Sequence, residues 1–183
     1  MSESARVPAM TITMYTMAVD SFAPMLASLS AILDKAAAHA ADTSADLANA
    51  RLAPDMFSLA QQVQSACHHA QDGVGRLTGR PPSQPEPVGA TLDDLKKRIA
   101  ETVAYLNSVD PAAFAGAEAR DCGIEIPGTI VIDMNGLQFL RAWALPHFYF
   151  HLVTAYGILR SQGVTIGKQD YLSQVAAFIR PAA

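Results

Sequence analysis

The sequence predicts an all-α protein, a four-helix bundle with a small β-hairpin inserted before the last long helix. Apolar residues recur at alternating spacings of three and four along four segments, which is typical of helices that pack in a bundle. In one short segment only, apolar and polar residues alternate instead, which is typical of a β-strand. The 183 residues, of which 50% are hydrophobic, are expected to form a single domain spanning residues 1–183.

The first helix is predicted at residues 12–41. Its apolar face consists of Tyr15, Val19, Phe22, Leu26, Leu29, Leu33 and Ala36. Pro24 lies inside this pattern and is expected to kink the helix or loosen its second turn, because proline lacks a backbone N–H.

The second helix is predicted at residues 55–77 and the third at residues 91–109. Gly79 ends the second helix, whose core face is Met56, Leu59, Val63, Ala66, Ala70, Val74 and Leu77. The four prolines between residues 80 and 90 indicate a crossover loop. Thr91 and Asp94 have the spacing of a capping box that opens the third helix. The buried stripe of that helix is Leu92, Leu95, Ile99, Val103 and Leu106.

The hairpin is predicted between residues 122 and 134, where isoleucines alternate with polar residues on both sides of Pro127-Gly128. Proline followed by glycine suits the central positions of a type II turn. The chain is expected to re-enter helix after residue 136, with Pro146 breaking it or restarting it as a fourth helix at residues 146–163. A short helix at residues 170–178 is expected to pack across one end of the bundle.

Composition and charge exclude several classes of protein. The net charge of −4 and the lack of a basic cluster argue against nucleic-acid binding. The first ten residues have no apolar segment typical of a signal peptide, and the apolar run 142–159 is interrupted by Pro146, His147 and His151. Cys67 and Cys122 are therefore interpreted as free thiols of a cytoplasmic protein that does not bind a membrane.

A histidine pair on the fourth helix is the candidate functional site. His147 and His151 are four residues apart, so their rings project from one face of the helix and can bind a single divalent metal ion. His147 lies in the first helical turn, where the helix dipole favours the neutral ring that binds metal. The alternative is purely structural: one ring bonds a backbone carbonyl and the other faces a loop. No glutamate follows His147, so the general base of a zincin motif is missing.

A third metal ligand has to come from the second helix. At 100° per residue, His69 and Gln62 lie at one border of its apolar stripe, Gln64 lies at the other, and His68 points away. His69 is therefore the preferred third ligand, with Gln62 and Gln64 as possible substitutes that hold a water molecule. Cys67, His68 and His69 cannot all bind one ion, because consecutive helical residues point in different directions.

The aromatic residues of the fourth helix are more typical of a core than of a ligand cage; they are Phe148, Tyr149, Phe150 and Tyr156. Trp143, which lies just before Pro146, is expected to seal one end of the bundle.

Several segments together resemble a known bacterial family of uncharacterised proteins. They are Met14-Tyr15, residues 29–36 (LSAILDKA), residues 51–57 (RLAPDMF) with Gln62 and Gln64, residues 145–151 (LPHFYFH), residues 154–156 (TAY) and residues 158–160 (ILR). The family is domain-of-unknown-function number nineteen ninety-three, within the DinB-like superfamily. The resemblance covers nearly the whole chain and implies a DinB-like four-helix bundle.

The resemblance also implies a site and a partner. Members of the superfamily are often dimeric and place one histidine of the second helix and an H-x-x-x-H pair of the fourth helix around a divalent metal. His147 and His151 fall on that pair, although the closer family usually carries asparagine at the position of His147. Judged by its spacing to Gly79, the position of the superfamily's second-helix histidine falls nearer Gln64 than His69. Leu152 and Val153 stand where the superfamily has polar residues just after the second histidine of the pair.

Three interpretations of the function remain open. The first is a metalloprotein that uses Zn, Ni, Fe or Mn for hydrolase-like or thiol-transferase-like chemistry, with enzymatic activity left open. The second is a bundle without metal or catalysis that binds a small molecule or serves in a stress response. The third is structural: the chain serves mainly as a homodimer subunit, because abundant Ala and Met on its helices suit close packing.

Overall fold

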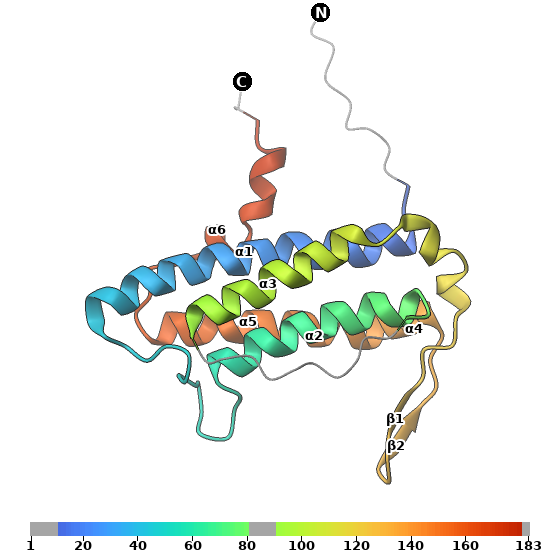
Figure 1. Ribbon diagram of the computed structural model, residues 1–183, viewed down its shortest axis with the longest axis horizontal. Coiled ribbons are helices and arrows are strands. Elements are labelled where there is room, and N and C mark those ends of the chain that lie inside the picture. The colour runs from blue at the N-terminus through green and yellow to red at the C-terminus, as the bar shows by residue number, and fades with distance from the viewer. Residues whose placement is uncertain (1–10, 81–90, 181–183) are drawn as a thin grey trace, which may run out of the picture.

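Four long helices form the bundle (Figure 1), which a computed structural model describes for residues 11–80 and 91–180. They are α1 (Met14–Thr43), α2 (Leu59–Leu77), α3 (Leu92–Ser108) and α5 (Leu145–Ser161). Helix α2 packs against both α3 and α5, and α1 packs against α3. The predicted four-helix bundle with a small hairpin inserted before the last long helix is confirmed. The predicted crossover loop falls largely on residues 81–90 and the N-terminal segment on residues 1–10, both outside the described residues.

Helix α1 is continuous from Met14 to Thr43, with Pro24 inside it, so Pro24 does not end the helix. Its length and composition are those of a segment that could cross a membrane, although half of its most apolar window is buried inside the protein. Phe22 and Leu26 are fully buried, and the Phe22 ring meets the edge of the Phe148 ring of α5 at 4.9 Å. These contacts make α1 a core helix of the bundle.

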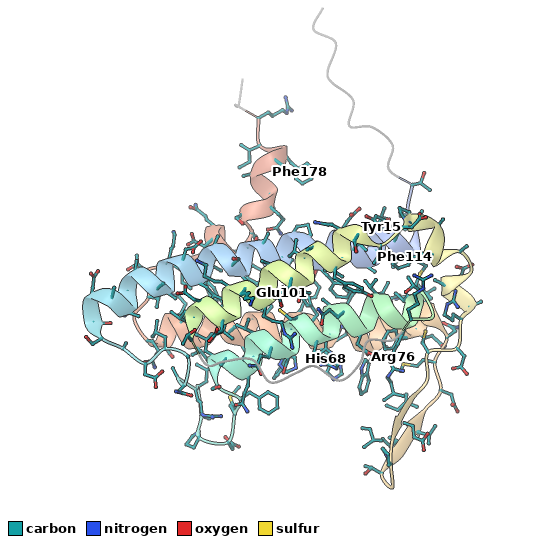
Figure 2. The ribbon with its side chains drawn as sticks, in the orientation of Figure 1. Tyr15, His68, Arg76, Glu101, Phe114 and Phe178 are labelled. Carbon is teal, nitrogen blue, oxygen red and sulfur yellow. The ribbon has the colours of Figure 1, made fainter. Side chains whose placement is uncertain are left out.

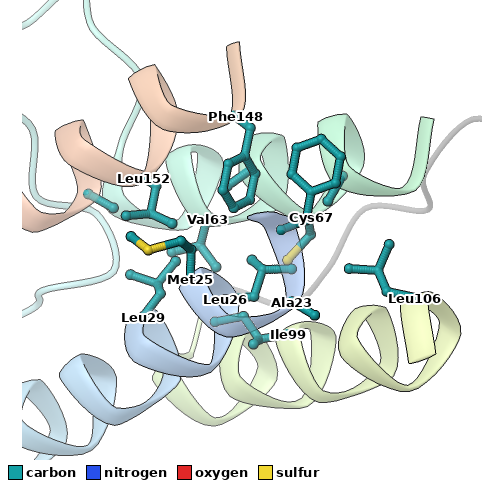
Figure 3. Close-up of a cluster of buried hydrophobic side chains, with 14 of the residues drawn as sticks. Ala23, Met25, Leu26, Leu29, Val63, Cys67, Ile99, Leu106, Phe148 and Leu152 are labelled. Atoms are coloured by element: carbon teal, nitrogen blue, oxygen red, sulfur yellow. The ribbon is translucent and has the colours of Figure 1, made fainter. Parts of the chain in front are cut away.

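The core lies where α1, α2, α3 and α5 meet (Figure 3). Leu26 of α1, Ile99 of α3 and Phe148 of α5 are each at most 1% exposed. Cys67 of α2 lies among them, and both it and Cys122 are buried free thiols, as the sequence predicted. Burial raises the pKa of the Cys67 thiol to about 11, so the side chain is uncharged at neutral pH.

Capping boxes determine where the helices begin. Thr91 and Asp94 open α3 as predicted, through reciprocal side-chain to backbone hydrogen bonds. The predicted start of α2 at Asp55 was wrong, because Ser58 and Gln61 form a capping box that begins the helix at Leu59. Phe57 therefore precedes the helix, and its carbonyl and ring are available to the site described below.

The hairpin and a short helix connect α3 to the start of α5. Strands β1 (Ile124–Ile126) and β2 (Ile130–Ile132) pair in antiparallel fashion, and Gly128 has the positive φ of 70° that a type II turn requires. A short helix, α4 (Gly136–Phe139), then continues into α5 through a π-helical turn, Leu140–Ala144. Pro146 therefore does not break the helical path, but α5 does restart there, since it begins at Leu145 with Pro146 in its first turn. The wider turn, in which the Leu145 N–H donates to the Leu140 carbonyl, accommodates a residue that has no N–H.

The predicted C-terminal helix also differs from the structure. Helix α6 (Lys168–Tyr171) is short and is followed by a 3-10 helix, Ser173–Phe178. Instead of packing across an end of the bundle, this last segment stands away from it on the α1 side (Figure 1). Phe178 is 82% exposed, because the hydrogen bonds of the preceding residues hold the segment at the middle of α1.

Candidate functional site

Three imidazole rings meet between α2 and α5, which lie side by side (Figure 1). The ring centroid of His69, on α2, is 4.7 Å from that of His147 and 5.3 Å from that of His151, both on α5. We call these three residues the histidine cluster. The His68 ring is 5.5 Å from the His69 ring and tilted by 59° to it, so it lies beside the cluster (its position on α2 is marked in Figure 2).

A backbone carbonyl orients the His147 ring. The Nδ1 atom of His147 lies 2.8 Å from the carbonyl oxygen of Trp143, one turn earlier in the chain. A carbonyl only accepts, so Nδ1 carries the proton and donates it, and Nε2 of the neutral ring keeps its lone pair. The Trp143 indole lies 4.3 Å from the His147 ring. Trp143 therefore flanks the histidine cluster rather than sealing an end of the bundle, as its position before Pro146 had suggested.

A buried glutamine orients the His151 ring. The Nδ1 atom of His151 lies 2.8 Å from Oε1 of Gln62, which is 2% exposed. The amide nitrogen of Gln62 donates to the Phe57 carbonyl at 3.4 Å, and this turns Oε1 toward the histidine. Gln62 thus holds a histidine in place instead of replacing one. Gln64, the other predicted substitute, is half-buried two positions along α2, about 200° around the helix from Gln62.

The surroundings of His69 and His151 lower the pKa of both rings. Burial, and then repulsion from His147, His151 and His68, lower the pKa of His69 to about 3. Burial and repulsion from His147 lower the pKa of His151 to about 4. Both rings are therefore unprotonated at neutral pH and retain the nitrogen lone pairs that bind metals.

Aromatic side chains surround the cluster. The Phe57 ring stacks on the His151 ring at 6.2 Å, and Phe150 meets that ring edge-on at 5.4 Å. Phe57 and Phe150 are 49% and 59% exposed, so they form an apolar rim that solvent can reach. The prediction that Phe150 belongs to the core was wrong, because this side chain faces solvent, whereas its neighbours Phe148 and Tyr149 pack in or against the core.

The rings of the cluster are stacked. The His69 plane is inclined by 9° to that of His151 and by 28° to that of His147. In residues 11–80 and 91–180, no group of three His, Cys, Asp or Glu side chains is arranged to hold a metal ion. The donor set itself fits a divalent transition metal, since it consists of three neighbouring imidazoles, two of them fixed through Nδ1.

Sequence reasoning identified the three histidines, and its structural alternative anticipated that one ring bonds a backbone carbonyl, as His147 does. It did not identify which carbonyl, and it named Gln62 as a substitute ligand rather than as the partner of His151. The Trp143 carbonyl could have been found, because it lies four residues before His147 in a helix. Phe57 gave no signal of this kind, since it lies in a loop whose path depends on the rest of the fold.

Comparison with known proteins assigns the chain to a family. The family model described as Domain of unknown function (DUF1993) matches residues 14–172, which include the whole histidine cluster. The chain belongs to this family. The DUF1993 protein is also similar to a DinB family member protein from Shewanella denitrificans, whose crystal structure is known. The two are 40% identical with a TM-score of 0.78, over 92% of this chain and 94% of that one. No curated protein matches significantly.

Proposed function

We propose that His69, His147 and His151 bind one divalent metal ion, Zn, Ni, Fe or Mn, in this DUF1993 protein. The observation that carries the proposal is the pair of Nδ1 hydrogen bonds, from His147 to the Trp143 carbonyl and from His151 to Gln62. In metalloproteins, ligating histidines commonly donate the second ring N–H to a carbonyl or a carboxylate, which sets the tautomer and the orientation of the ring.

Burial supports the same role. His151 is 8% exposed, and its low pKa keeps Nε2 unprotonated over the whole physiological pH range. A buried nitrogen lone pair without a donor is unfavourable, and a metal ion satisfies it. Among the described residues, no hydrogen bond fixes the orientation of the half-buried His69 ring. Of the three rings, His69 is therefore the one that can turn toward a metal ion.

The chemistry proposed for the site is hydrolase-like or thiol-transferase-like. A divalent ion held by the three histidines would lower the pKa of a bound water or thiol. Gln62 and Trp143 keep two of the rings in place, and the Phe57 and Phe150 rings lie against the buried His151 ring. These two exposed rings also offer an apolar surface to the body of a substrate.

Elemental analysis of untagged protein purified without chelators tests the proposal. We expect close to one equivalent of Zn, Ni, Fe or Mn per chain, and a higher melting temperature after one of these ions is added to chelator-treated protein. The His147→Ala variant should bind the ion at least tenfold more weakly. His68→Ala is the matched control, because this neighbouring ring lies outside the cluster, and it should bind within about twofold of wild type.

Less than about a tenth of an equivalent of metal, together with no thermal shift for any of the four ions, would contradict metal binding.

A second candidate function would then remain, namely binding of a planar apolar molecule without metal. The near-parallel rings of His69 and His151 and the exposed Phe57 ring favour it. Trp143, the only tryptophan, lies against His147. Its fluorescence should therefore respond to aromatic compounds in the presence of a chelator.

A further inference from the structure

The C-terminal arm, defined as residues 175–180, carries apolar side chains that its own bundle does not cover. Val175, Phe178 and Ile179 are 44%, 82% and 74% exposed. The arm stands away from the bundle on the α1 side, with Phe178 far out along it (Figures 1 and 2). Large apolar side chains grouped on a projecting segment are typical of an interaction surface.

The base of the arm is anchored, so its direction is defined. The Ser173 hydroxyl lies 2.7 Å from that of Ser28, a buried residue of α1. The Gln174 amide donates to the Met25 sulfur at 3.1 Å, and just before the arm Asp170 pairs with Lys35 at 2.6 Å. Three contacts with α1 therefore hold the base of the arm and leave its end in solvent.

An apolar groove lies at the N-terminal end of α1. Its volume is about 520 Å³, which is ample for two large side chains. Tyr15 and Phe114 pack edge to face in it at 5.6 Å and lie close together in Figure 2. Apart from one glutamate, Glu118, the described residues that line the groove are uncharged, and Ile12 at its edge is 81% exposed.

In its observed 3-10 conformation the arm does not reach the groove of its own chain. Ser28 and Tyr15 are thirteen residues apart on α1, a distance of about 20 Å. Phe178 lies five residues beyond Ser173, which is about 10 Å in the observed 3-10 helix, and the segment stands away from α1. A second copy of the chain is not restricted in this way.

We propose that the arm of one copy docks into the groove of a second copy, in a reciprocal two-fold dimer. The chemistry of the two surfaces matches: Phe178 and Ile179 enter the apolar groove, and Arg180 pairs with Glu118. A two-fold axis repeats every contact, so each dimer holds two arms in two grooves. This inference does not depend on metal binding by the histidine cluster.

Sedimentation equilibrium of the full chain tests the proposal, with charge reversal as the decisive variant. We expect a dimer in the micromolar range. Arg180→Glu alone and Glu118→Arg alone should each raise the dimer dissociation constant at least tenfold, because two like-charged pairs face each other in every dimer. The chain with both reversals should return to within about threefold of wild type.

Removal of the apolar side chains of the C-terminal arm is the second part of the test. Phe178→Ser combined with Ile179→Ser should give a monomer that melts at the same temperature as wild-type protein diluted below its dimer dissociation constant, because neither side chain packs in its own bundle. Val131→Ser is the matched control, since Val131 is 65% exposed on the hairpin, and it should leave the dimer intact. A monomeric wild type, or a dimer that survives the arm substitutions, overturns the proposal. Failure of the double reversal to restore the dimer overturns the choice of groove.

Discussion

Replacement of His151 by alanine is expected to lower metal affinity at least a hundredfold and to destabilise the metal-free protein by about 2 kcal/mol. The loss of affinity follows from removal of one of three ligands. The loss of stability follows because Oε1 of Gln62 is left without its donor in a site that is 2% exposed. Calorimetric titration with metal and urea unfolding in the presence of a chelator measure the two effects separately.

A double-mutant cycle shows whether the stranded glutamine causes the destabilisation. His151→Leu alone leaves Oε1 of Gln62 without its donor, whereas His151→Leu with Gln62→Leu removes both partners. The double variant should therefore lose clearly less stability than the sum of the two single variants. Additive losses would contradict a direct role for the hydrogen bond. His68→Ala, the matched control, should change neither metal affinity nor stability appreciably.

Acidification is expected to destabilise the metal-free protein between pH 6.5 and pH 4. The folded-state pKa values of His69 and His151, about 3 and about 4, lie below the value of 6.5 for a solvated histidine. The unfolded chain therefore takes up protons first as the pH falls, and the stabilisation that is complete above pH 6.5 is lost on the acid side. Between pH 7 and pH 5 the free energy of unfolding should fall by about 2 kcal/mol, with allowance for solvent screening of the half-buried His69.

Urea unfolding at fixed protein concentration in a chelating buffer measures this slope. The His69→Gln variant should lose roughly half of the dependence on pH. Asp94, whose pKa is lowered by its hydrogen bond with Thr91, and Asp170, whose pKa is lowered by Lys35, contribute only at more acidic pH. A free energy of unfolding that is constant from pH 7 to pH 5 would show that the two rings are not held neutral by burial.

Local sequence patterns predicted most of the fold. They failed where two patterns indicated different helix starts, and where contacts between distant parts of the chain determine the position of a segment. The beginning of α3 was predicted because Thr91 and Asp94 are both visible in the sequence. The beginning of α2 was placed too early because Met56 continues the apolar spacing, although the Ser58 capping box begins the helix. At the C-terminus, Phe178 fits the pattern of a packed helix, but whether a packing surface lies within its reach depends on the path of the whole chain.

In the candidate site too, local patterns predicted some residues, and contacts between distant parts of the chain determine others. His147 and His151 share a face of one helix, so their proximity follows from spacing alone, and the helical projection of α2 selected His69 over His68. The partner of His151 is Gln62, which lies 89 positions away along the chain. Its role depends on the packing of α2 against α5, and no local pattern encodes it. The sequence therefore predicted the candidate ligands but not the groups that orient them.

X-ray absorption spectroscopy of the metal-loaded protein tests the central claim most directly. If His69, His147 and His151 hold the ion, a zinc-loaded sample should show three imidazole nitrogens at about 2.0–2.1 Å. Both His151→Ala and His69→Ala should reduce that number, and His68→Ala should leave it unchanged. A first shell made only of oxygen atoms, or an imidazole signal that persists after both cluster substitutions, would contradict metal binding by the histidine cluster.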